Sequence, residues 1–335
     1  MKKMKFTEAI ESAISQAMTE DPGVILFGED VELMHLGLTG RFGTQRVRST
    51  PISESAFLGM GVGAAMGGLR PVVEIMLVDF IGVAFDGILN HASKLEGFSG
   101  GRWNLPLVVK ASCGGGYGDG GQHEQTLWAM FAHIPGIHVA VPSNPADAGS
   151  LMYSSIRSDG PVVFLEHKLL SEKWLEYMGS GGRKTVSYDL PPEGRKGEVP
   201  SKWEPEEPGK ARILREGKDI TLVSLAVGVH RCMEAAELLS QRGTEAEVID
   251  LRWVAPLDRD LILESAGKTG KLLVVDEDYK AFGLTGEIAA LLAENDMAYK
   301  YRRVATEETI PYFRELEDQV LPNVDRILKA AEEIL

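Results

Sequence analysis

Runs of apolar residues typical of buried strands alternate with helical patterns along most of this chain. The strand-like runs occupy residues 24–30, 70–77, 105–112, 138–143 and 161–167. Between them, apolar residues recur three or four positions apart, which is the spacing of a helix that buries one face. Parallel strands need a long crossover, usually a helix, and are covered on both faces. The alternation therefore predicts an α/β fold with a mainly parallel sheet flanked by helices.

The alternation stops once, between residues 171 and 217, and this interruption predicts two domains. The stretch holds five prolines and many charges with little periodicity, which is typical of an irregular connection. From residue 218 the strand and helix patterns return, and 335 residues are enough for two separate cores. We expect α/β domains over 1–170 and 218–335, joined by a linker over 171–217.

Charge and composition exclude several classes of function. The net charge is −14 and lysine and arginine form no dense cluster, so nucleic acid is not an expected partner. No run of about 18 apolar residues occurs, so no membrane span is expected. The first residues, "MKKMKFTEAIESAISQAM", lack the apolar core of a secretion signal, and we expect a cytoplasmic protein.

Cysteine and histidine show no pattern that predicts a metal site. Cys113 and Cys232 are the only cysteines, too few for a disulfide framework or a cysteine-rich zinc site. The seven histidines show no ligand spacing. We therefore expect no metal ligands in this chain.

The segment 50–71 predicts a helix with one nearly bare face. Gly59, Gly63 and Gly67 are four residues apart, so they share a face on which another backbone can approach closely. Each glycine costs a helix roughly 1 kcal/mol relative to alanine, so only tight packing would offset three of them. We expect a close helix pair there, for which a subunit boundary is one location. Glu54 stands at the start of this helix, where the helix dipole favours a carboxylate.

A second glycine-rich stretch, Ser112–Thr126, leaves two interpretations open. It could cradle phosphates, or it could be a loop that carries His123 into an active site. No Gly-Lys-Ser/Thr sequence follows, so a P-loop is excluded. A nicotinamide-dependent enzyme needs a glycine fingerprint between an early strand and a helix, and "GMGVGA" follows no predicted strand.

The stretch "ESAFLGMGVGA", from Glu54 to Ala64, resembles the signature of pyrimidine-binding domains in thiamine diphosphate enzymes. The wider text, including "GQHEQ", "HIPGIHVAVPSNPADA" and "PVVFLEHKLL", resembles the beta subunit of 2-oxo acid dehydrogenase complexes. "EVIDLRWVAPLD" and "FGLTGEIAALLAE" are similar to its C-terminal domain. The resemblance implies a pyrimidine-binding domain of the thiamine diphosphate fold, followed by a transketolase C-terminal-like domain.

The resemblance also implies roles for five residues of this chain. Glu54 would hydrogen-bond the aminopyrimidine ring of thiamine diphosphate, and Glu29 would be a second acid near it. Phe80 would pack on the pyrimidine, and Ile52 would line the same pocket. His123 would face the cofactor and assist acyl transfer, a task that suits a group able to hold or give a proton near neutral pH.

The same resemblance implies partners. The chain would work with an alpha subunit in an alpha2beta2 heterotetramer, and the alpha subunit would hold Mg²⁺ and the diphosphate. "GYGDGG" and Asn144 look like the diphosphate motif but are not assigned that role, because in the family that motif belongs to alpha. A small 2-oxo acid would be the substrate, and a lipoyl-bearing acyltransferase core would accept the acyl group.

Alternatives remain open within and beyond this class. Acetoin dehydrogenase beta subunits share the fold and the cofactor, and a branched-chain substrate is a third option. A non-catalytic scaffold paralogue is a different class, and it predicts loss of the acid and the histidine, whereas Glu54 and His123 are both present. Glu124 departs from the family pattern, which often has serine at that position.

Overall fold

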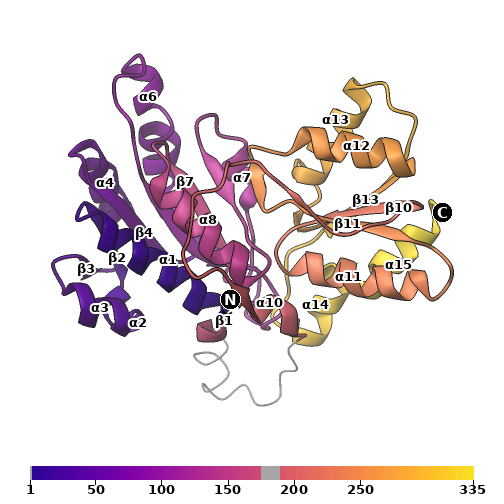
Figure 1. The fold of residues 1–335 in the computed structure, drawn as a ribbon, viewed down its shortest axis with the longest axis horizontal. Coiled ribbons are helices and arrows are strands. Elements are labelled where there is room, and N and C mark those ends of the chain that lie inside the picture. Colours follow the sequence, from indigo (N-terminus) through magenta and orange to yellow (C-terminus); the bar gives the residue numbers. More distant parts are fainter. Residues whose placement is uncertain (1, 175–188) are drawn as a thin grey trace.

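Two lobes, each built around its own β-sheet, make up the molecule (Figure 1). They follow one another along the sequence, except that one strand of the later lobe's sequence, residues 253–255, joins the first sheet. The structure is a computed structural model, and it describes residues 2–174 and 189–335. Part of the predicted linker, residues 175–188, therefore lies outside the described residues.

The first sheet has seven strands in the order β12-β6-β7-β5-β4-β2-β3, and all neighbours are parallel except β12 with β6. The strands are β2 (Val24–Glu29), β3 (Val47–Thr50), β4 (Arg70–Leu77), β5 (Val108–Cys113), β6 (His138–Ala140), β7 (Val162–His167) and β12 (Trp253–Ala255). Helices α1 (Phe6–Glu20) and α8 (Pro145–Arg157) cover one face. The other face packs against α4 (Glu54–Met66), α5 (Ile81–Asp86) and α7 (Trp128–Ala132).

Neighbouring residues along these strands point to opposite faces, so each strand contributes to two cores. Val72 packs in the core under α1 and α8, whereas Val73 packs in the core under α4. Val108 and Val109 divide in the same way on the adjacent strand. Burial on both faces explains why these strands are continuously apolar in sequence.

The second sheet has five strands in the order β14-β13-β10-β11-β9, parallel except for β9. Its strands are β9 (Arg212–Arg215), β10 (Ile220–Ser224), β11 (Ala246–Asp250), β13 (Lys271–Tyr279) and β14 (Lys300–Thr306). Helices α11 (Val227–Ser240) and α15 (Val324–Glu332) cover one face, and α12 (Arg259–Thr269) and α13 (Leu284–Glu294) cover the other (Figure 1). The prediction of two α/β domains with mainly parallel sheets is confirmed.

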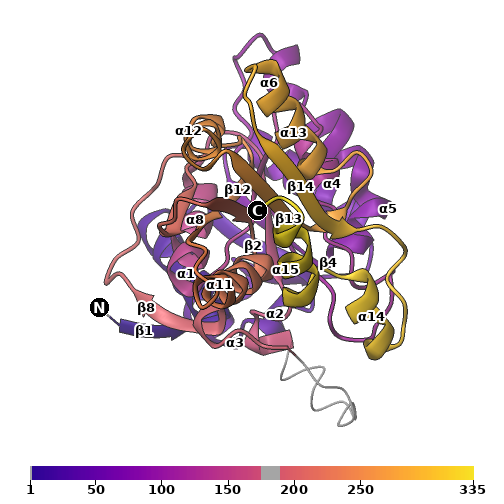
Figure 2. The same ribbon diagram turned by 90° about the vertical axis from the view of Figure 1, so that its right-hand side faces the viewer.

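The remaining elements are short and lie around the two sheets. β1 (Lys2–Lys5) and β8 (Lys196–Val199) pair antiparallel at the periphery, as Figure 2 shows. The others are α2 (Val31–Met34), α3 (Leu36–Phe42), η1 (Val78–Phe80), η2 (Gly87–Ala92), α6 (Leu95–Phe98), α10 (Pro192–Arg195) and α14 (Arg314–Val320). In the part of the chain that the structure describes, no helix combines the length and the apolar composition that crossing a membrane requires.

Two local expectations differ from the structure. The sequence pattern of residues 84–96 predicts one helix, but η2 (Gly87–Ala92) within it is a π-helix, and an added Cβ at its first residue, Gly87, would lie 3.0 Å from Leu58 of α4. The segment 171–217 contains β8 and β9, whose four-residue lengths are too short to show a periodicity.

The reason given above against a nicotinamide site was partly wrong. A strand does precede the glycines, because β3 ends at Thr50, four residues before Glu54. The glycines of "GMGVGA" nevertheless lie inside α4 and not in the turn before it. A dinucleotide fingerprint needs them in that turn, so the exclusion holds for this different reason.

Candidate active site

The residues singled out from the sequence gather at the carboxyl edge of the first sheet. Glu29 is the last residue of β2, and Glu54 begins α4 just after β3. Phe80 follows β4, and His123 lies in the loop that follows β5. Ligands of open α/β sheets bind outside this edge. The fold therefore brings four predicted residues, far apart in sequence, to one side of the molecule.

Glu29 and Glu54 interact through their charges. Burial raises the pKa of Glu29, and the negative charges of Asp30 and Glu54 raise it further. Asp30 makes the sharp turn out of the strand with a left-handed backbone, φ +52°. Two neighbouring carboxyls, one of which keeps its proton to higher pH, are the arrangement expected for acid–base work.

Phe80 and His123 contact each other edge to face. Their ring centroids are 6.0 Å apart and the ring planes are inclined by 79°. Nδ1 of His123 lies 3.3 Å from the carbonyl oxygen of Asp119. In the neutral ring, Nδ1 would donate to that carbonyl and Nε2 would be the acceptor. The contact orients the histidine and gives its two nitrogens different roles.

Ile52 lies in the segment between β3 and α4, and its side chain is 72% exposed. A single exposed aliphatic side chain is ordinary at a protein surface and by itself indicates no pocket. Within this chain its predicted position in the pocket has no support from packing.

Three residues that the sequence analysis missed connect the two domains beside this site. Nε2 of Gln125 donates to Oδ1 of Asp79 at 2.7 Å, and the hydroxyl of Tyr279 donates to Oε1 of Gln125 at 3.1 Å. Burial raises the pKa of Asp79. Its Oδ2 is buried and has no hydrogen-bond partner among the described residues. That oxygen is available to a donor on a bound group, which is one respect in which the site fits a cofactor.

Asp79 and Gln125 have a sequence signal, because they stand next to Phe80 and two residues after His123. Tyr279 has none. It comes from β13 of the other domain, and only the packing of the second domain against the first brings it here.

The glycines before His123 have a steric role. Gly114, Gly116, Gly118 and Gly120 all have left-handed backbones, with φ between +72° and +101°. A Cβ at Gly114 would lie 2.1 Å from the His167 ring. Side chains are therefore excluded both by the backbone and by the close approach of other segments.

Side chains at the end of β7 and from β13 of the second domain also hold the loop in place. Lys168 Nζ donates to the carbonyl oxygen of His123 at 2.6 Å, and burial lowers the pKa of that lysine. Gly115 N–H donates to Glu277 Oε1 at 2.7 Å, and His167 Nε2 lies 2.9 Å from the same oxygen. Asn144 caps α8, where its side chain accepts from Asp147 N–H at 3.0 Å, so it does not point to a phosphate.

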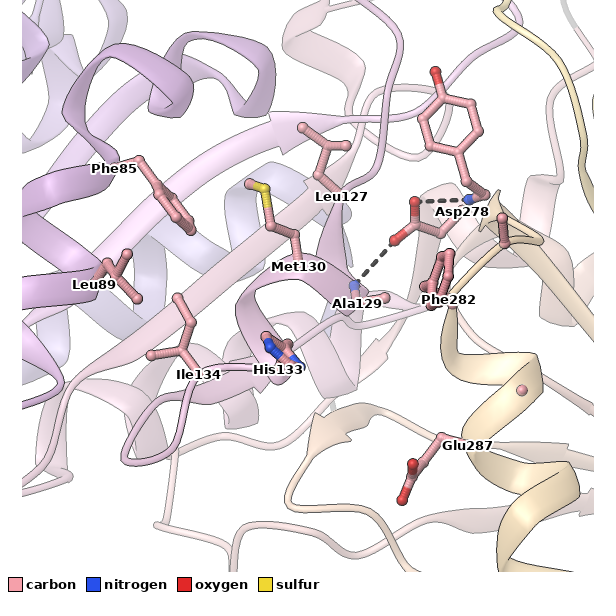
Figure 3. A pocket seen from close by; sticks show the side chains of 14 residues that line it. Phe85, Leu89, Leu127, Ala129, Met130, His133, Ile134, Asp278, Phe282 and Glu287 are labelled. Carbon is pink, nitrogen blue, oxygen red and sulfur yellow. Dashed lines mark hydrogen bonds between the residues drawn. The ribbon is translucent and has the colours of Figure 1, made fainter.

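A cavity of about 1040 Å³ lies between the domains beside the Tyr279 end of this network (Figure 3). Its first-domain wall is mostly apolar, with Phe85, Leu89, Met130 and Ile134, and it also includes His133. Asp278, on the other side, accepts from Ala129 N–H at 3.0 Å. Neither Glu29 nor Glu54 lines it, so it adjoins the candidate site and does not contain the acids.

The described part of the chain gives no support for a metal site of its own. Across residues 2–174 and 189–335, no three histidine, cysteine, aspartate or glutamate side chains are grouped to hold an ion.

Comparisons with known proteins agree with this architecture. The family described as "Transketolase, pyrimidine binding domain" matches residues 2–173, and "Transketolase, C-terminal domain" matches residues 209–327. A solved structure titled "Split gene transketolase, inactive beta4 tetramer" has a TM-score of 0.78 and 22% identity, covering 99% of this chain and 98% of its own. The fold is that of the transketolase-like α/β proteins.

Curated relatives narrow this class. The chain is 36% identical to "Acetoin:2,6-dichlorophenolindophenol oxidoreductase subunit beta" of Cupriavidus necator, over 100% of this chain and 98% of the relative. It is 37% identical to "2-oxoisovalerate dehydrogenase subunit beta" of Bacillus subtilis, over 100% and 99%. It is 38% identical to a mitochondrial "Pyruvate dehydrogenase E1 component subunit beta-2" of Oryza sativa, over 99% and 86%. The chain belongs to the family of the beta subunits of 2-oxo acid and acetoin dehydrogenases.

Proposed function

We propose that this chain is the beta subunit of a thiamine diphosphate-dependent 2-oxo acid dehydrogenase. The enzyme would decarboxylate a 2-oxo acid oxidatively and pass the acyl group to lipoyl groups of an acyltransferase core. The observation that carries the proposal is the charge interaction between Glu29 and Glu54 at the sheet edge that also presents the Phe80–His123 pair. These four residues are among the five to which the resemblance assigns roles in the family's chemistry.

The bound thiamine diphosphate would supply an electron sink for the loss of carbon dioxide. Glu54 would hold a proton between its carboxyl and the aminopyrimidine ring. Glu29, whose pKa is raised, would keep a proton available beside it. Phe80 would pack against the pyrimidine ring and keep water away. His123 would hold or release a proton at Nε2 during acyl transfer.

An alpha subunit would complete the site. Large apolar side chains are exposed around α4, α5 and α6: Ile52, Met60, Met66, Leu69, Val83, Phe98 and Trp103. An added Cβ on Gly59 or Gly63 would meet nothing within 4 Å, so the bare helix face predicted from the sequence is open in this chain. Open apolar surface of this extent supports an obligate subunit contact.

Mg²⁺ and the diphosphate would be held by the alpha subunit, which carries the diphosphate motif in the family that this chain resembles. We propose an alpha2beta2 heterotetramer that works in the cytoplasm and delivers its product to a lipoyl-bearing core.

Acetoin is the second candidate substrate. Two bacterial relatives named for acetoin oxidation, from Cupriavidus necator and Bacillus subtilis, are 36% and 37% identical to this chain over nearly its whole length. Relatives named for branched-chain and pyruvate substrates have similar identities, so overall similarity does not separate the three.

The decisive experiment uses the complex purified through a tag on this chain, together with its alpha subunit. Thiamine diphosphate and Mg²⁺ are added, and reduction of an artificial electron acceptor is followed with pyruvate, a branched-chain 2-oxo acid or acetoin. We expect turnover with one of them, lost in Glu54→Gln. No turnover with any substrate, despite a co-purified alpha subunit, would contradict the proposal and favour a non-catalytic paralogue.

A further inference from the structure

The carboxyl groups of Glu124 and Glu317, both buried and from different domains, lie side by side next to the His123 segment of the loop. Oε1 of Glu124 accepts from Tyr117 N–H at 2.8 Å, and Oε1 of Glu317 accepts from Gly118 N–H at 2.7 Å. Glu124 belongs to the glycine-rich loop, whereas Glu317 belongs to α14 of the second domain. Both side chains are 0% exposed. Because consecutive amides hold them, the two carboxyls lie side by side.

The second oxygen of each carboxyl is left without a hydrogen bond. Oε2 of Glu124 and Oε2 of Glu317 are both buried and have no hydrogen-bond partner among the described residues. Two ionised carboxylates could not satisfy each other, since both accept only. A single proton between them would turn one into a donor and satisfy both oxygens, as in other carboxyl pairs that cannot ionise together.

The charges around the pair are compatible with one proton. Arg314 lies 3.7 Å from Oε2 of Glu317 and forms a closer ion pair, 2.6 Å, with Asp318. Lys168, a residue of the first domain, interacts through its charge with Glu124, and also with Asp119 and Asp79. With one shared proton the pair has a single negative charge, opposite the ammonium of Lys168.

Burial is the largest cause that raises the pKa of Glu317, followed by the adjacent carboxyl of Glu124 and its charge. The Gly118 N–H and Arg314 act in the opposite direction and do not prevail. The raised pKa of Glu317 agrees with the two buried oxygens that lack a donor, because both observations require one neutral carboxyl in the pair.

The loop fits closely against the second domain around this pair. A Cβ at Gly120 would lie 2.9 Å from the Tyr312 ring, and a Cβ at Gly121 would lie 2.9 Å from Cγ2 of Thr309. Gln122 also donates to the Tyr312 hydroxyl. Residues 120–122 are thus held by the same segment of the second domain, between Gly118 and Glu124, and His123 lies within that span.

We propose that Glu124 and Glu317 share one proton and act as a positioning pair that clasps the His123 loop against α14. The role in acyl transfer rests on the function proposed above, whereas the clasp itself does not. The pair touches neither substrate nor cofactor. It acts through His123, whose ring must stand at a fixed place relative to the reacting groups.

The clasp should weaken as the solution becomes alkaline. A carboxyl whose folded pKa is raised holds its proton in the folded protein while the unfolded chain has lost it. Its stabilising contribution is therefore complete below the ordinary pKa of a glutamate and is lost as the pH rises through the folded pKa. Ionisation of the second carboxyl would bury two adjacent negative charges and push α14 away from the loop.

Amide variants provide the sharpest test. In Glu124→Gln the amide N–H replaces the shared proton, its oxygen can still accept from Tyr117, and the pair keeps one negative charge. Glu317→Gln does the same from the other side. Both should hold the loop at all pH values, whereas Glu124→Ala should release it. Glu315→Gln is the matched control, because it removes an exposed carboxyl from the same helix.

Two rates are measured on the complex with the alpha subunit: lipoyl-dependent acyl transfer and reduction of an artificial acceptor. The quantity compared is the first rate divided by the second. We expect the wild-type ratio to fall about tenfold to a hundredfold at alkaline pH, as for a misplaced catalytic group. The ratio should stay flat in both amide variants and be low at every pH in Glu124→Ala. Equal pH profiles in wild type and Glu124→Gln would overturn the proposal.

Infrared spectra test the proton without any catalysis. The folded wild-type protein and Glu315→Gln should show the carbonyl stretch of neutral carboxyls near neutral pH, to which Asp250 and Asp276, whose pKa values are also raised, contribute in every variant. This band should lose the intensity of one carboxyl in Glu124→Gln and in Glu317→Gln. An identical band in all four proteins would refute the shared proton. If the complex has no activity at all, the function proposed above fails, and the infrared result still decides the clasp.

Discussion

The part of the candidate site around Glu29 and Glu54 (the acid end) and the part around His123 (the histidine end) differ in how much of their surroundings this chain supplies. Glu54 and Ile52 border exposed apolar surface, and the helix that starts at Glu54 has a bare, open face. The loop with His123 is enclosed by β7 on one side and by the second domain on the other. The acid end thus depends on a partner, whereas the histidine end is prepared within the chain.

The difference has a physical origin. A proton acceptor for a bound cofactor must face the cofactor, so its surroundings belong partly to the subunit that holds the rest of that molecule. A histidine on a loop must be placed to within a fraction of an ångström to act, and a glycine-rich loop has high conformational entropy to lose. Contacts from two domains offset that cost.

The largest expected effect is on activity at the acid end. Glu54→Gln should lower kcat by roughly 10²–10⁴-fold, the usual contribution of a positioned acid or base. Because Glu54 is only half-buried at the first turn of its helix, the thermal unfolding temperature should hardly change. Calorimetry and the artificial-acceptor assay on the same preparation would check both parts. A large drop in unfolding temperature would mean that the acid end is structural after all.

The largest expected effect on stability is at the histidine end. Glu277→Ala removes the carboxylate that accepts from Gly115 N–H and pairs with His167. Leaving that buried histidine without its partner should cost about 3–5 kcal/mol in the free energy of unfolding. Urea unfolding of the purified complex would measure it.

Glu277 also determines part of how the stability of the protein changes as the pH falls. Although burial acts to raise it, the net pKa of Glu277 is lowered, because His167 and other donors favour the carboxylate. A lowered folded pKa means that the contribution is present above the ordinary glutamate pKa and is lost as the pH falls through the folded value. In Glu277→Ala the stability should therefore fall less steeply below pH ~4.5, the ordinary range of a glutamate. Parallel acid profiles for the two proteins would contradict this.

Gly120→Ala should have a smaller effect at the same end. The new Cβ would require a left-handed backbone at φ +74° and would meet the Tyr312 ring at 2.9 Å. We expect a loss of about 1–3 kcal/mol in unfolding free energy. Acyl transfer should fall more than artificial-acceptor reduction, because the loop that carries His123 shifts. Equal losses in the two assays would argue against this role of the loop.

Gly63→Ala is the glycine substitution at the acid end that corresponds to Gly120→Ala. It has the smallest expected effect on the free energy of unfolding, and it should raise that free energy where Gly120→Ala lowers it. Its new Cβ meets nothing within 4 Å in this chain. The isolated chain should therefore gain up to about 1 kcal/mol, from helix propensity alone. The heterotetramer should weaken, because the added methyl group enters the proposed subunit contact. Unfolding of the isolated chain and sedimentation of the complex would separate the two, and unchanged assembly would locate that contact elsewhere.

The comparison also shows which parts of the site the sequence could reveal. Glu29, Glu54, Phe80 and His123 follow strand ends or begin a helix, so their placement at one sheet edge follows from the strand–helix alternation. Tyr279 and Glu317 could not be found in this way. They lie in the second domain, at positions where a tyrosine in a strand and a glutamate in a helix look ordinary.

The interpretation of the glycine stretch shows the same limit. The sequence left two possibilities for Ser112–Thr126 and indicated the loop with His123 because no phosphate motif followed. It gave no sign that Gly115 faces Leu321, where a Cβ would lie 2.6 Å from a methyl carbon, or that Glu124 meets Glu317. Those approaches depend on how two separately folded sheets dock.

By itself, the sequence determined the two α/β domains, their mainly parallel sheets and the side of the first sheet that presents the candidate residues, because periodicity and strand ends are local properties of the chain. The tertiary structure alone decided that the second domain closes over the His123 loop, that two glutamates nearly two hundred positions apart meet there, and that the helix after Glu54 stays open. Burial and charge pairing between distant segments have no local signature, since their free energies depend on which surfaces meet.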